Sequence, residues 1–363
     1  MKLLDSIKNK DIYFIAEMSG NHGGKLDNAI EIVRAAANAG ADCLKIQTFT
    51  ADTITIDCNA GDFQTMAGGL WEGRTLYDLY NEAHTPWEWQ AAIKEECEKL
   101  GMDFLSSVFD PSAIDFLDTL GVEMYKIASP ELVDIPLILY AASKGKPMII
   151  SCGMGTAEEI CEAVEACKSV NNDQIVLLKC TSEYPADYED MNIATIPDMK
   201  ARFGCDVGLS DHSMGWTVDI AAAALGACVI EKHFCLSRKE RTVDSDFSME
   251  PHEFAGMVRD VRLAKAAIGR ATYERSDKEL RNLTGRRSLY AVDSISKGEP
   301  FTKDNVRSIR PGYGIAPKHL DKLLGRISKR DIDFGSPDHR RRSGYIAADR
   351  RCWAIDVSTR KAS

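Results

Sequence analysis

The chain has 363 residues, of which 44% are hydrophobic, and a formal net charge of −10. Its length suits a large domain with a small appended one. No run approaches the roughly 18 apolar residues that a membrane-spanning helix needs, and the acidic balance argues against nonspecific nucleic-acid binding, which requires a basic surface. The start, MKLLDSIKNKD, is too charged for a secretory signal.

Eleven cysteines occur without any CxxC pair, and several lie inside apolar, strand-like runs, among them Cys43, Cys180 and Cys228. This pattern is typical of reduced, buried thiols rather than of a disulfide framework. We therefore expect a cytoplasmic protein.

Short β-type runs alternate with helical patterns up to about residue 268. The runs are DIYFIAE, CLKIQT, DFLSSV, MYKIAS, PMIISCG, IVLLKCT, CDVGLSDH and CVIEKHF. Segments between them, such as 26–40, 87–101 and 156–168, repeat apolar residues with a period near 3.6 and carry capping residues at their ends. Eight such βα units predict an α/β fold of the (β/α)8 TIM-barrel type rather than an open doubly wound sheet.

Two features depart from this regular alternation. A long insertion at about residues 49–86 follows the second strand, and loops of that length are usually lids or binding loops. A surface loop without a role in function is the alternative. After a polar linker at 271–284, short strands and tight turns predict a small β-rich domain from about residue 285.

The active site of a TIM barrel lies at the C-terminal ends of its strands. The predicted strands deliver many polar residues there, in chain order: Glu17, Ser19, Asn21 and His22; Lys45 and Gln47; Ser106 and Ser107; Lys126, Ser129 and Glu131; Ser151; Lys179, Thr181 and Ser182; Ser210, Asp211 and His212; and Glu231, Lys232 and His233. Strand ends with a purely structural role would not collect so many polar groups.

Three of the lysines, Lys45, Lys126 and Lys179, come from alternate strands, which contribute side chains to the same interior layers. Lysine is almost never buried without a partner, so we expect these to bind an anion. Serine hydroxyls can add donors to it, namely those of Ser107, Ser129, Ser151 and Ser210. Alternatively, a lysine points outward or pairs with Glu17 or Glu231.

His212 and His233 end neighbouring strands, which lie roughly 4.8 Å apart in a sheet. Both imidazoles can therefore bind one divalent cation and leave positions open for water and substrate. Two hydrogen-bonded structural histidines are the alternative, although Asp211 and Glu231 nearby favour a metal. Imidazole and oxygen ligands suit Mn, Mg, Co or Zn. Glu17 could act as a general base, support the metal ligands or pair with a lysine, and we expect it to position water or substrate near the metal.

Several segments at these strand ends resemble the sialic acid synthase family: FIAEMSGNHGGKLDNA, AGADCLKIQTFTADT, YKIASPEL, LLKCTSEYPA, VGLSDHSMG and LGACVIEKHF. RSIRPGYG resembles the arginine motif of that family's C-terminal antifreeze-like (SAF) domain. The resemblance runs from about residue 11 to 337. Within the family, WEGRTLYDLYNEAHTPWEW and EMSGNH are similar to the pseudaminic acid synthases rather than to the N-acetylneuraminate enzymes.

The resemblance implies a synthase barrel at 1–270, a SAF domain at 285–337 and a domain-swapped homodimer in which Arg310 reaches the partner's barrel. It implies that phosphoenolpyruvate binds to Lys45, Ser107, Lys126, Ser129, Ser151, Ser182 and Ser210, the metal to His212 and His233, and the acylamino sugar to Gln47, Glu131, Tyr184, Asp244 and Arg310. Glu17, Lys45, Lys126, His212 and His233 would be catalytic. Residues 338–363 are arginine-rich and depart from the family pattern.

The implied reaction joins phosphoenolpyruvate to 2,4-diacetamido-2,4,6-trideoxy-L-altrose and releases phosphate. The N-acetylneuraminate and legionaminic acid synthases, which use other acylamino sugars, are alternatives within the family. A class I aldolase with a Schiff base on Lys126 or Lys179 is a more distant one. A carbohydrate-binding or ice-binding protein is suggested by the SAF domain alone, and the charged strand ends argue against it.

Overall fold

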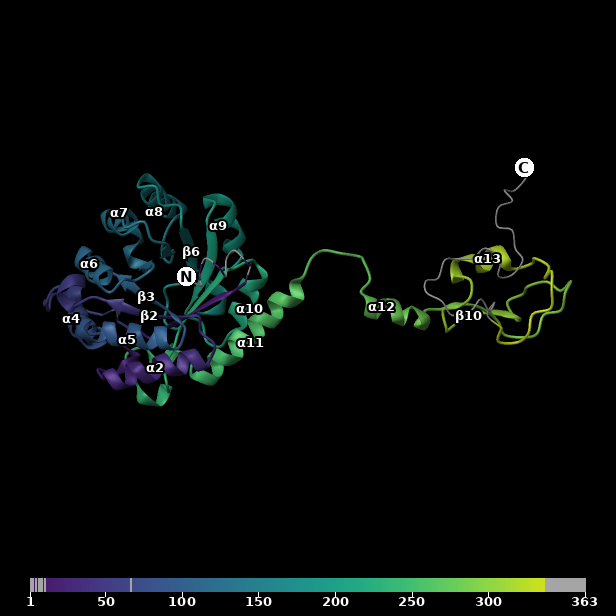
Figure 1. The fold of residues 1–363 in the computed structure, drawn as a ribbon, viewed down its shortest axis with the longest axis horizontal. Coiled ribbons are helices and arrows are strands. Elements are labelled where there is room, and N and C mark those ends of the chain that lie inside the picture. The colour runs from purple at the N-terminus through teal and green to yellow at the C-terminus, as the bar shows by residue number, and fades with distance from the viewer. Residues whose placement is uncertain (1–2, 4, 6–8, 10, 66, 337–363) are drawn as a thin grey trace. The chain divides into compact units, whose positions relative to one another are not determined.

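The computed structural model describes residues 3, 5, 9, 11–65 and 67–336. Eight parallel strands close into a barrel in chain order (Figure 1), since β1 pairs with both β2 and β8. Their bounds are β1 Tyr13–Glu17, β2 Cys43–Thr48, β3 Asp103–Val108, β4 Tyr125–Ile127, β5 Met148–Ser151, β6 Ile175–Cys180, β7 Asp206–Asp211 and β8 Val229–His233. The predicted TIM barrel is confirmed.

Helices surround the strands in Figure 1. They are α2 Leu26–Asn38, α5 Trp87–Lys99, α6 Pro111–Thr119, α7 Ile135–Ser143, α8 Ala157–Ser169, α9 Thr195–Phe203, α10 Thr217–Ala224 and α11 Pro251–Ile268. Local sequence explains where they begin. Thr156 and Glu159 form a reciprocal capping box at the start of α8, and Asp110 caps α6 ahead of a proline at its first position.

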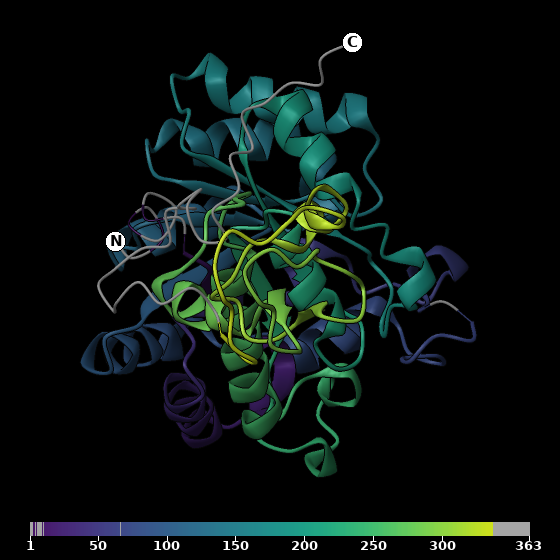
Figure 2. The same cartoon turned by 90° about the vertical axis from the view of Figure 1, so that its right-hand side faces the viewer.

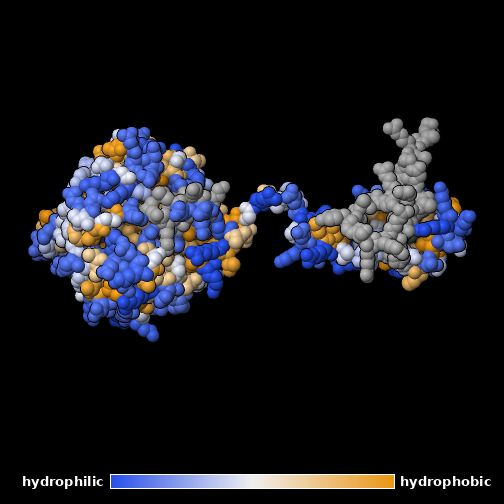
Figure 3. All heavy atoms as spheres, viewed as in Figure 1, coloured by the Kyte–Doolittle hydropathy of each residue, from blue (hydrophilic) through white to orange (hydrophobic). Residues whose placement is uncertain are grey.

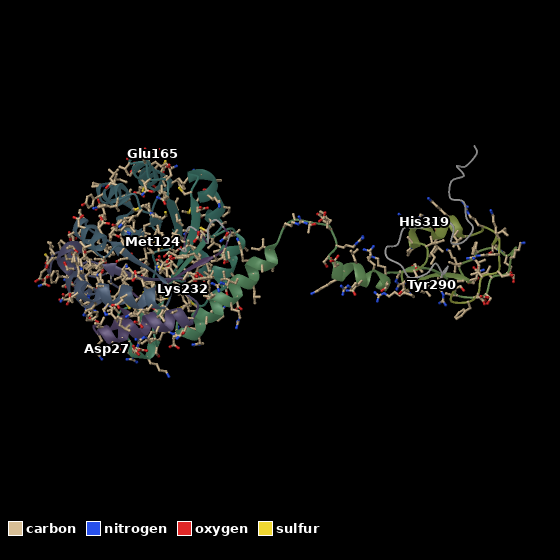
Figure 4. All side chains as sticks on the ribbon, in the orientation of Figure 1. Asp27, Met124, Glu165, Lys232, Tyr290 and His319 are labelled. Atoms are coloured by element: carbon tan, nitrogen blue, oxygen red, sulfur yellow. The ribbon has the colours of Figure 1, made fainter. Side chains whose placement is uncertain are left out.

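The strands alternate between two environments, because successive side chains point to opposite faces. One set packs under the helices. The other fills the barrel interior with an apolar cluster of Leu3, Tyr13, Ile15, Cys43, Leu105, Met124, Ile149, Val176, Leu178 and Val229. Met124 marks this layer in Figure 4. The cluster members that lie in strands all precede the last residue of their strand, and Met124 directly precedes β4, so this layer forms a floor beneath the polar strand ends.

The 49–86 insertion folds into α3 Ala51–Ile54, the 3-10 helix η2 Gly61–Phe63 and α4 Leu76–Ala83. Five further 3-10 turns in this unit are η1 Ser19–His22, η3 Pro130–Val133, η4 Tyr188–Asp190, η5 Arg238–Glu240 and η6 Ser245–Phe247. These turns follow strands, and η1 and η3 carry the strand-end residues Ser19, Asn21, His22 and Glu131. The irregular segments at the C-terminal end of the barrel are therefore largely ordered by short turns.

A second unit begins at Arg270. It contains α12 Asp277–Arg281, the turn η7 Asn282–Gly285, the antiparallel pair β9 Ser288–Ala291 and β10 Val306–Ile309, the turn η8 Pro317–His319 and α13 Leu320–Leu323. Its own core consists of Leu289, Ala291, Ile295, Phe301, Val306, Leu323 and Ile332. Figure 2 turns this unit toward the viewer and shows that much of its chain is irregular. The predicted small β-rich domain is confirmed, whereas the atypical tail at 338–363 lies outside the described residues.

Hydrophilic and hydrophobic residues intermingle on the face drawn in Figure 3. No described helix combines the length and apolar character needed to cross a membrane. The described cysteines are all free thiols, and most of them are buried. Cys43 and Cys180 are buried within β2 and β6 as expected, whereas Cys228 lies just before β8 and is half-buried.

Candidate active site

Two lysines enter the barrel directly above its apolar floor. Lys45 on β2 and Lys126 on β4 are 4% and 2% exposed, so both ammonium groups are removed from water. Lys45 Nζ lies 2.7 Å from Glu17 Oε2 and 3.4 Å from Glu231 Oε1, and Lys126 Nζ lies 3.9 Å from that same Glu231 oxygen. The alternative raised above, pairing with Glu17 and Glu231, is thus realised in the structure without substrate.

Serine hydroxyls complete this layer. Lys126 donates to Ser151 Oγ at 2.6 Å, Lys45 donates to Ser107 Oγ at 3.4 Å, and Ser210 Oγ donates to Glu231 at 3.3 Å. All three serines were expected here. The layer therefore joins two cations, two carboxylates and several hydroxyls inside a buried space.

In this layer, burial and neighbouring opposite charges shift the pKa of each ionisable group in opposite directions. Burial raises the pKa of Glu17, whereas Lys126 and Lys45 outweigh burial at Glu231 and lower its pKa. Burial lowers the pKa of Lys126. At Lys45 burial has the same effect, but Glu17 and Glu231 outweigh it and raise the pKa. Glu231 is consequently the carboxylate that stays ionised most readily, and Glu17 is the carboxyl of the layer that is easiest to protonate.

Lys179 does not belong to this layer, and its predicted place beside the other two lysines is wrong. On β6 the inward residues are Val176 and Leu178, which pack in the barrel interior, so alternation directs Lys179 outward. Its Nζ donates to the carbonyl of Cys180 at 2.8 Å and to Thr181 Oγ1 at 3.3 Å. Cys180, which the sequence analysis did not select for the site, takes the inward position instead.

Gly153 follows β5 and packs closely against side chains at the ends of β4 and β6. The Gly153 N–H donates to Ser129 Oγ at 3.0 Å. A Cβ atom at Gly153 would lie 2.3 Å from Ser182 Oγ, 2.8 Å from Ser129 Oγ and 3.1 Å from Cys180 Sγ. Any larger residue would therefore displace these groups, and the absence of a side chain lets the two hydroxyls and the thiol come together. Both Ser129 and Ser182 were expected in the site, whereas Gly153 was not.

His212 and His233 meet at the mouth of the barrel, with ring centroids 5.4 Å apart. His212 Nδ1 lies 2.8 Å from the carbonyl of Thr181, which can only accept, so Nδ1 carries the proton and Nε2 is left as a possible ligand. Nδ1 of His233 is buried and has no hydrogen-bond partner among the described residues. Burial and nearby cations hold the pKa of His233 well below its usual value, so its imidazole is neutral, as metal coordination requires.

These two residues fit a divalent cation as a pair of ligands. Within the part of the chain that the structure describes, no cluster of three or more His, Cys, Asp or Glu side chains has the arrangement of a metal site. Any cation held here would therefore keep several positions for water or substrate, as in catalytic metal sites.

Four of the five residues expected to hold the sugar, Gln47, Glu131, Tyr184 and Asp244, lie on or after strands at this end of the barrel. Gln47 Nε2 donates to Glu17 Oε1 at 2.9 Å and to Ser19 Oγ at 3.0 Å. Asp244 is buried, and burial raises its pKa. Glu131 Oε2 is buried without a hydrogen-bond partner among the described residues, and burial raises the pKa of this carboxyl to about 7. An unpartnered, buried carboxyl is a typical contact for a ligand hydroxyl or amide.

An aromatic wall borders the histidines. The ring centroid of Tyr184 lies 4.4 Å from that of His212 and 5.2 Å from that of Phe247. The Phe247 centroid in turn lies 4.8 Å from that of His233. Trp71 of the insertion lies 5.9 Å from Tyr184, and its Nε1 donates to the carbonyl of Val243 at 2.9 Å. The insertion thus touches the site. Phe247 and Trp71 were not selected individually from the sequence.

Arg310 belongs to the second unit, directly after β10, and its side chain is exposed. The structure describes that unit by itself, so the proposed reach of Arg310 into a partner's barrel stays a prediction.

Comparisons with known proteins match both parts of the chain. The model of the NeuB family matches residues 32–273, and that of the SAF domain matches residues 286–337. A pseudaminic acid synthase of Campylobacter jejuni is 43% identical over 90% of this chain and 95% of its own length. An N,N'-diacetyllegionaminic acid synthase of Legionella pneumophila is 36% identical over 89% of this chain and 92% of its own.

Solved structures agree with this. The crystal structure of an N-acetylneuraminic acid synthetase from Leptospira borgpetersenii, determined in complex with citrate, superposes with a TM-score of 0.67 at 30% identity, covering 75% of this chain and 90% of that one. The chain therefore belongs to the NeuB family, which confirms the predicted membership in the sialic acid synthase family and the predicted class of enzyme, a phosphoenolpyruvate-dependent nonulosonic acid synthase.

Proposed function

We propose that this enzyme is a pseudaminic acid synthase, which condenses phosphoenolpyruvate and water with 2,4-diacetamido-2,4,6-trideoxy-L-altrose to give pseudaminic acid and phosphate. The observation that carries the proposal is the combination of a buried lysine and serine layer with an aromatic-lined mouth that the 49–86 insertion helps to form. Relatives named pseudaminic acid synthase reach 43% identity, against 36% for a legionaminic acid synthase.

Phosphoenolpyruvate is the anion that suits the interior layer. Lys45 and Lys126 would bind its phosphate and carboxylate, and Ser107, Ser129, Ser151, Ser182 and Ser210 would donate hydrogen bonds to the same oxygens. Two buried cations and fixed hydroxyls neutralise charge and orient the C3 carbon toward the mouth. The close packing around Gly153 supports this placement, since it allows the hydroxyls of Ser129 and Ser182 to lie near one another.

The sugar aldehyde would lie at the mouth, held by Gln47, Glu131, Tyr184 and Asp244, with Arg310 of a second subunit. A divalent cation such as Mn, Mg or Co on His212 and His233 would supply Lewis-acid polarisation of the aldehyde. The aromatic wall offers an apolar face to the 6-methyl group of a trideoxy sugar, whereas the 6-hydroxyl of N-acetylmannosamine would lose hydration there.

The reaction then needs few proton transfers. The C3 carbon of phosphoenolpyruvate forms a bond to the aldehyde carbon, and positive charge develops at C2. Water adds at C2, with Glu17 positioned to orient it, and the resulting tetrahedral carbon expels phosphate by cleavage of its C–O bond. Glu17 suits this task, because the raised pKa of its buried carboxyl makes a proton easy to accept.

Phosphate release from a panel of acylamino sugars tests the proposal. With phosphoenolpyruvate and Mn²⁺ present, the diacetamido-trideoxy-altrose should give the highest kcat/KM. Faster turnover of N-acetylmannosamine or of the legionaminic acid precursor would reassign the enzyme within the family. Trapping of the protein by borohydride with a keto substrate, together with indifference to chelators, would instead indicate the aldolase alternative.

A further inference from the structure

Behind the two histidines lies a charged cluster that faces the helices rather than the substrate. It consists of Asp211 on β7, Lys232 on β8 and Asp219 on α10, which are 1%, 1% and 0% exposed. Lys232 Nζ donates to Asp211 Oδ2 and, at 2.7 Å, to the carbonyl of Ser213, and it lies 3.6 Å from Asp219 Oδ2. Figure 4 labels Lys232 inside the barrel unit.

The cluster is placed one residue before each histidine. Asp211 and Lys232 are register partners on adjacent strands, and His212 and His233 follow them directly. Because side chains alternate along a strand, the ion pair points to the helix layer while the two imidazoles point into the mouth. Holding Asp211 against Lys232 therefore also fixes the separation of the two rings.

The same contacts order the turn beyond His212. Asp211 Oδ1 accepts from the Ser213 N–H at 2.8 Å and Oδ2 accepts from Ser213 Oγ at 3.1 Å, while Lys232 binds the Ser213 carbonyl. The backbone of Ser213 is therefore hydrogen-bonded at both its N–H, by Asp211, and its carbonyl, by Lys232. On the other side of His212, its Nδ1 is fixed by the carbonyl of Thr181. The backbone that carries this imidazole has little freedom left.

Packing alone does not explain why charges lie here. Burying an ion pair removes both groups from water, and apolar residues of similar volume often give equal or greater stability. The ionic contacts instead specify geometry, since each of them forms only with one register of β7 and β8 and one conformation of the turn at Ser213. Such a requirement serves a site in which two ligands on different strands must converge on one point.

We infer that Asp211, Lys232 and Asp219 form a buried positioning cluster that sets the spacing of His212 and His233 and thereby the affinity of the site for its divalent cation. The inference rests on the metal site of the proposed function. None of the three side chains touches the mouth, so they act through the histidines.

The test measures Mn²⁺ binding to the full-length protein by calorimetry, without substrate. The variant K232M/D211N removes one cation and one anion together, so neither charge of that pair is left uncompensated. Asp219 loses the lysine 3.6 Å away, but burial raises the pKa of its carboxyl to about 8, so this group is neutral near pH 7. K232M alone is compared with the double variant. We expect the dissociation constant for Mn²⁺ to rise about 10-fold or more in the double variant, the scale seen when residues that orient metal ligands are removed. Saturating Mn²⁺ should restore much of kcat.

Two measurements separate this positioning role from a general loss of structure. The affinity for phosphoenolpyruvate without metal should change little, and so should the melting temperature of the double variant. Lys146→Met is the matched control, because Lys146 pairs with Asp118 ahead of β5, at the opposite end of the barrel; its Mn²⁺ affinity should equal that of the wild type.

Wild-type Mn²⁺ affinity in K232M/D211N would overturn the inference, and so would an equal loss of Mn²⁺ and phosphoenolpyruvate binding, which would indicate general support of the barrel. A wild-type protein that binds no Mn²⁺ would refute the metal site itself. The two failures are therefore distinguishable, since the first leaves wild-type binding intact.

Discussion

Replacing Lys126 by methionine tests the interior layer most directly. The ammonium group is 2% exposed and donates to Ser151 Oγ at 2.6 Å, so its charge is not screened by water. Glu231 keeps Lys45 at 3.4 Å after the change, which leaves no carboxylate of the layer without a cation. The fold should therefore survive, while phosphoenolpyruvate loses one of its two interior cations.

The size of the effect follows from that loss. A hydrogen bond that involves a charged group contributes about 1.5–3 kcal/mol, which corresponds to a decrease of about 10- to 150-fold in kcat/KM for phosphoenolpyruvate. Phosphate release is measured with phosphoenolpyruvate varied at saturating sugar and Mn²⁺. Because methionine carries no charge for phosphoenolpyruvate to bind, the decrease in kcat/KM for phosphoenolpyruvate should not be overcome by adding more sugar.

Lys179→Met is the matched control for this experiment. Lys179 lies on β6, points away from the layer, and donates to the carbonyl of Cys180. Its replacement should leave kcat/KM for phosphoenolpyruvate within about 2-fold of the wild-type value, as for a residue outside the substrate site. Wild-type kinetics in Lys126→Met, or an equal defect in both variants, would refute the reasoning.

Three further predictions concern Gly153, the histidines and the second unit. Gly153→Ala should raise the KM for phosphoenolpyruvate more than that for the sugar, because the added Cβ would lie 2.3 Å from Ser182 Oγ and displace that hydroxyl; an unchanged KM would show that the substrate does not depend on the position of Ser182. His212→Ala and His233→Ala should abolish Mn²⁺ binding and turnover with the fold retained, and full activity of exhaustively chelated wild-type enzyme would contradict this. Mixed dimers of Arg310→Ala and His233→Ala should regain part of the activity, since one barrel receives both working parts. No rescue despite subunit exchange would place Arg310 in its own subunit's site or outside any site.

The barrel and much of its polar layer could be predicted from the sequence. Eight short strands in a regular order fix the topology, and chain order alone then brings all strand ends to one rim. Lys45 and Lys126 were expected in the interior because they lie on alternate strands near their C-terminal ends, and the structure buries both there. The histidine pair was expected because His212 and His233 end neighbouring strands, and their rings lie side by side in the structure.

The outward direction of Lys179 could not be predicted, for a physical reason. The run IVLLKC is apolar on both faces, since one face packs in the barrel and the other under the helices. A strand buried on both faces shows no alternation that tells which residues point inward. A shift of one residue then exchanges the two faces, which is why Cys180 rather than Lys179 lies inside.

Other parts of the site carry no chemical signal in the sequence. Gly153 contributes by having no side chain, and only the closeness of Ser129 and Ser182 shows that a larger residue there would disturb the site. Phe247 and Trp71 come from segments that follow the strands at irregular distances. Their contacts with Tyr184 depend on how the loops fold over the rim, and such loop geometry is not contained in local periodicity.

The charges at the end of the barrel explain how the site can exist before substrate binds. Two lysines buried without partners would be very costly, and Glu17 and Glu231 balance them at distances of 2.7 and 3.4 Å from Lys45 Nζ. An entering anion must therefore compete with these carboxylates, so net charge alone does not account for its binding. The directed hydroxyls of Ser107 and Ser151, and those of Ser129 and Ser182 beside Gly153, add what the lysines lack, namely hydrogen-bond donors in an arrangement that suits phosphate and carboxylate oxygens. Selectivity for such an anion then depends on the hydroxyls as much as on the cations.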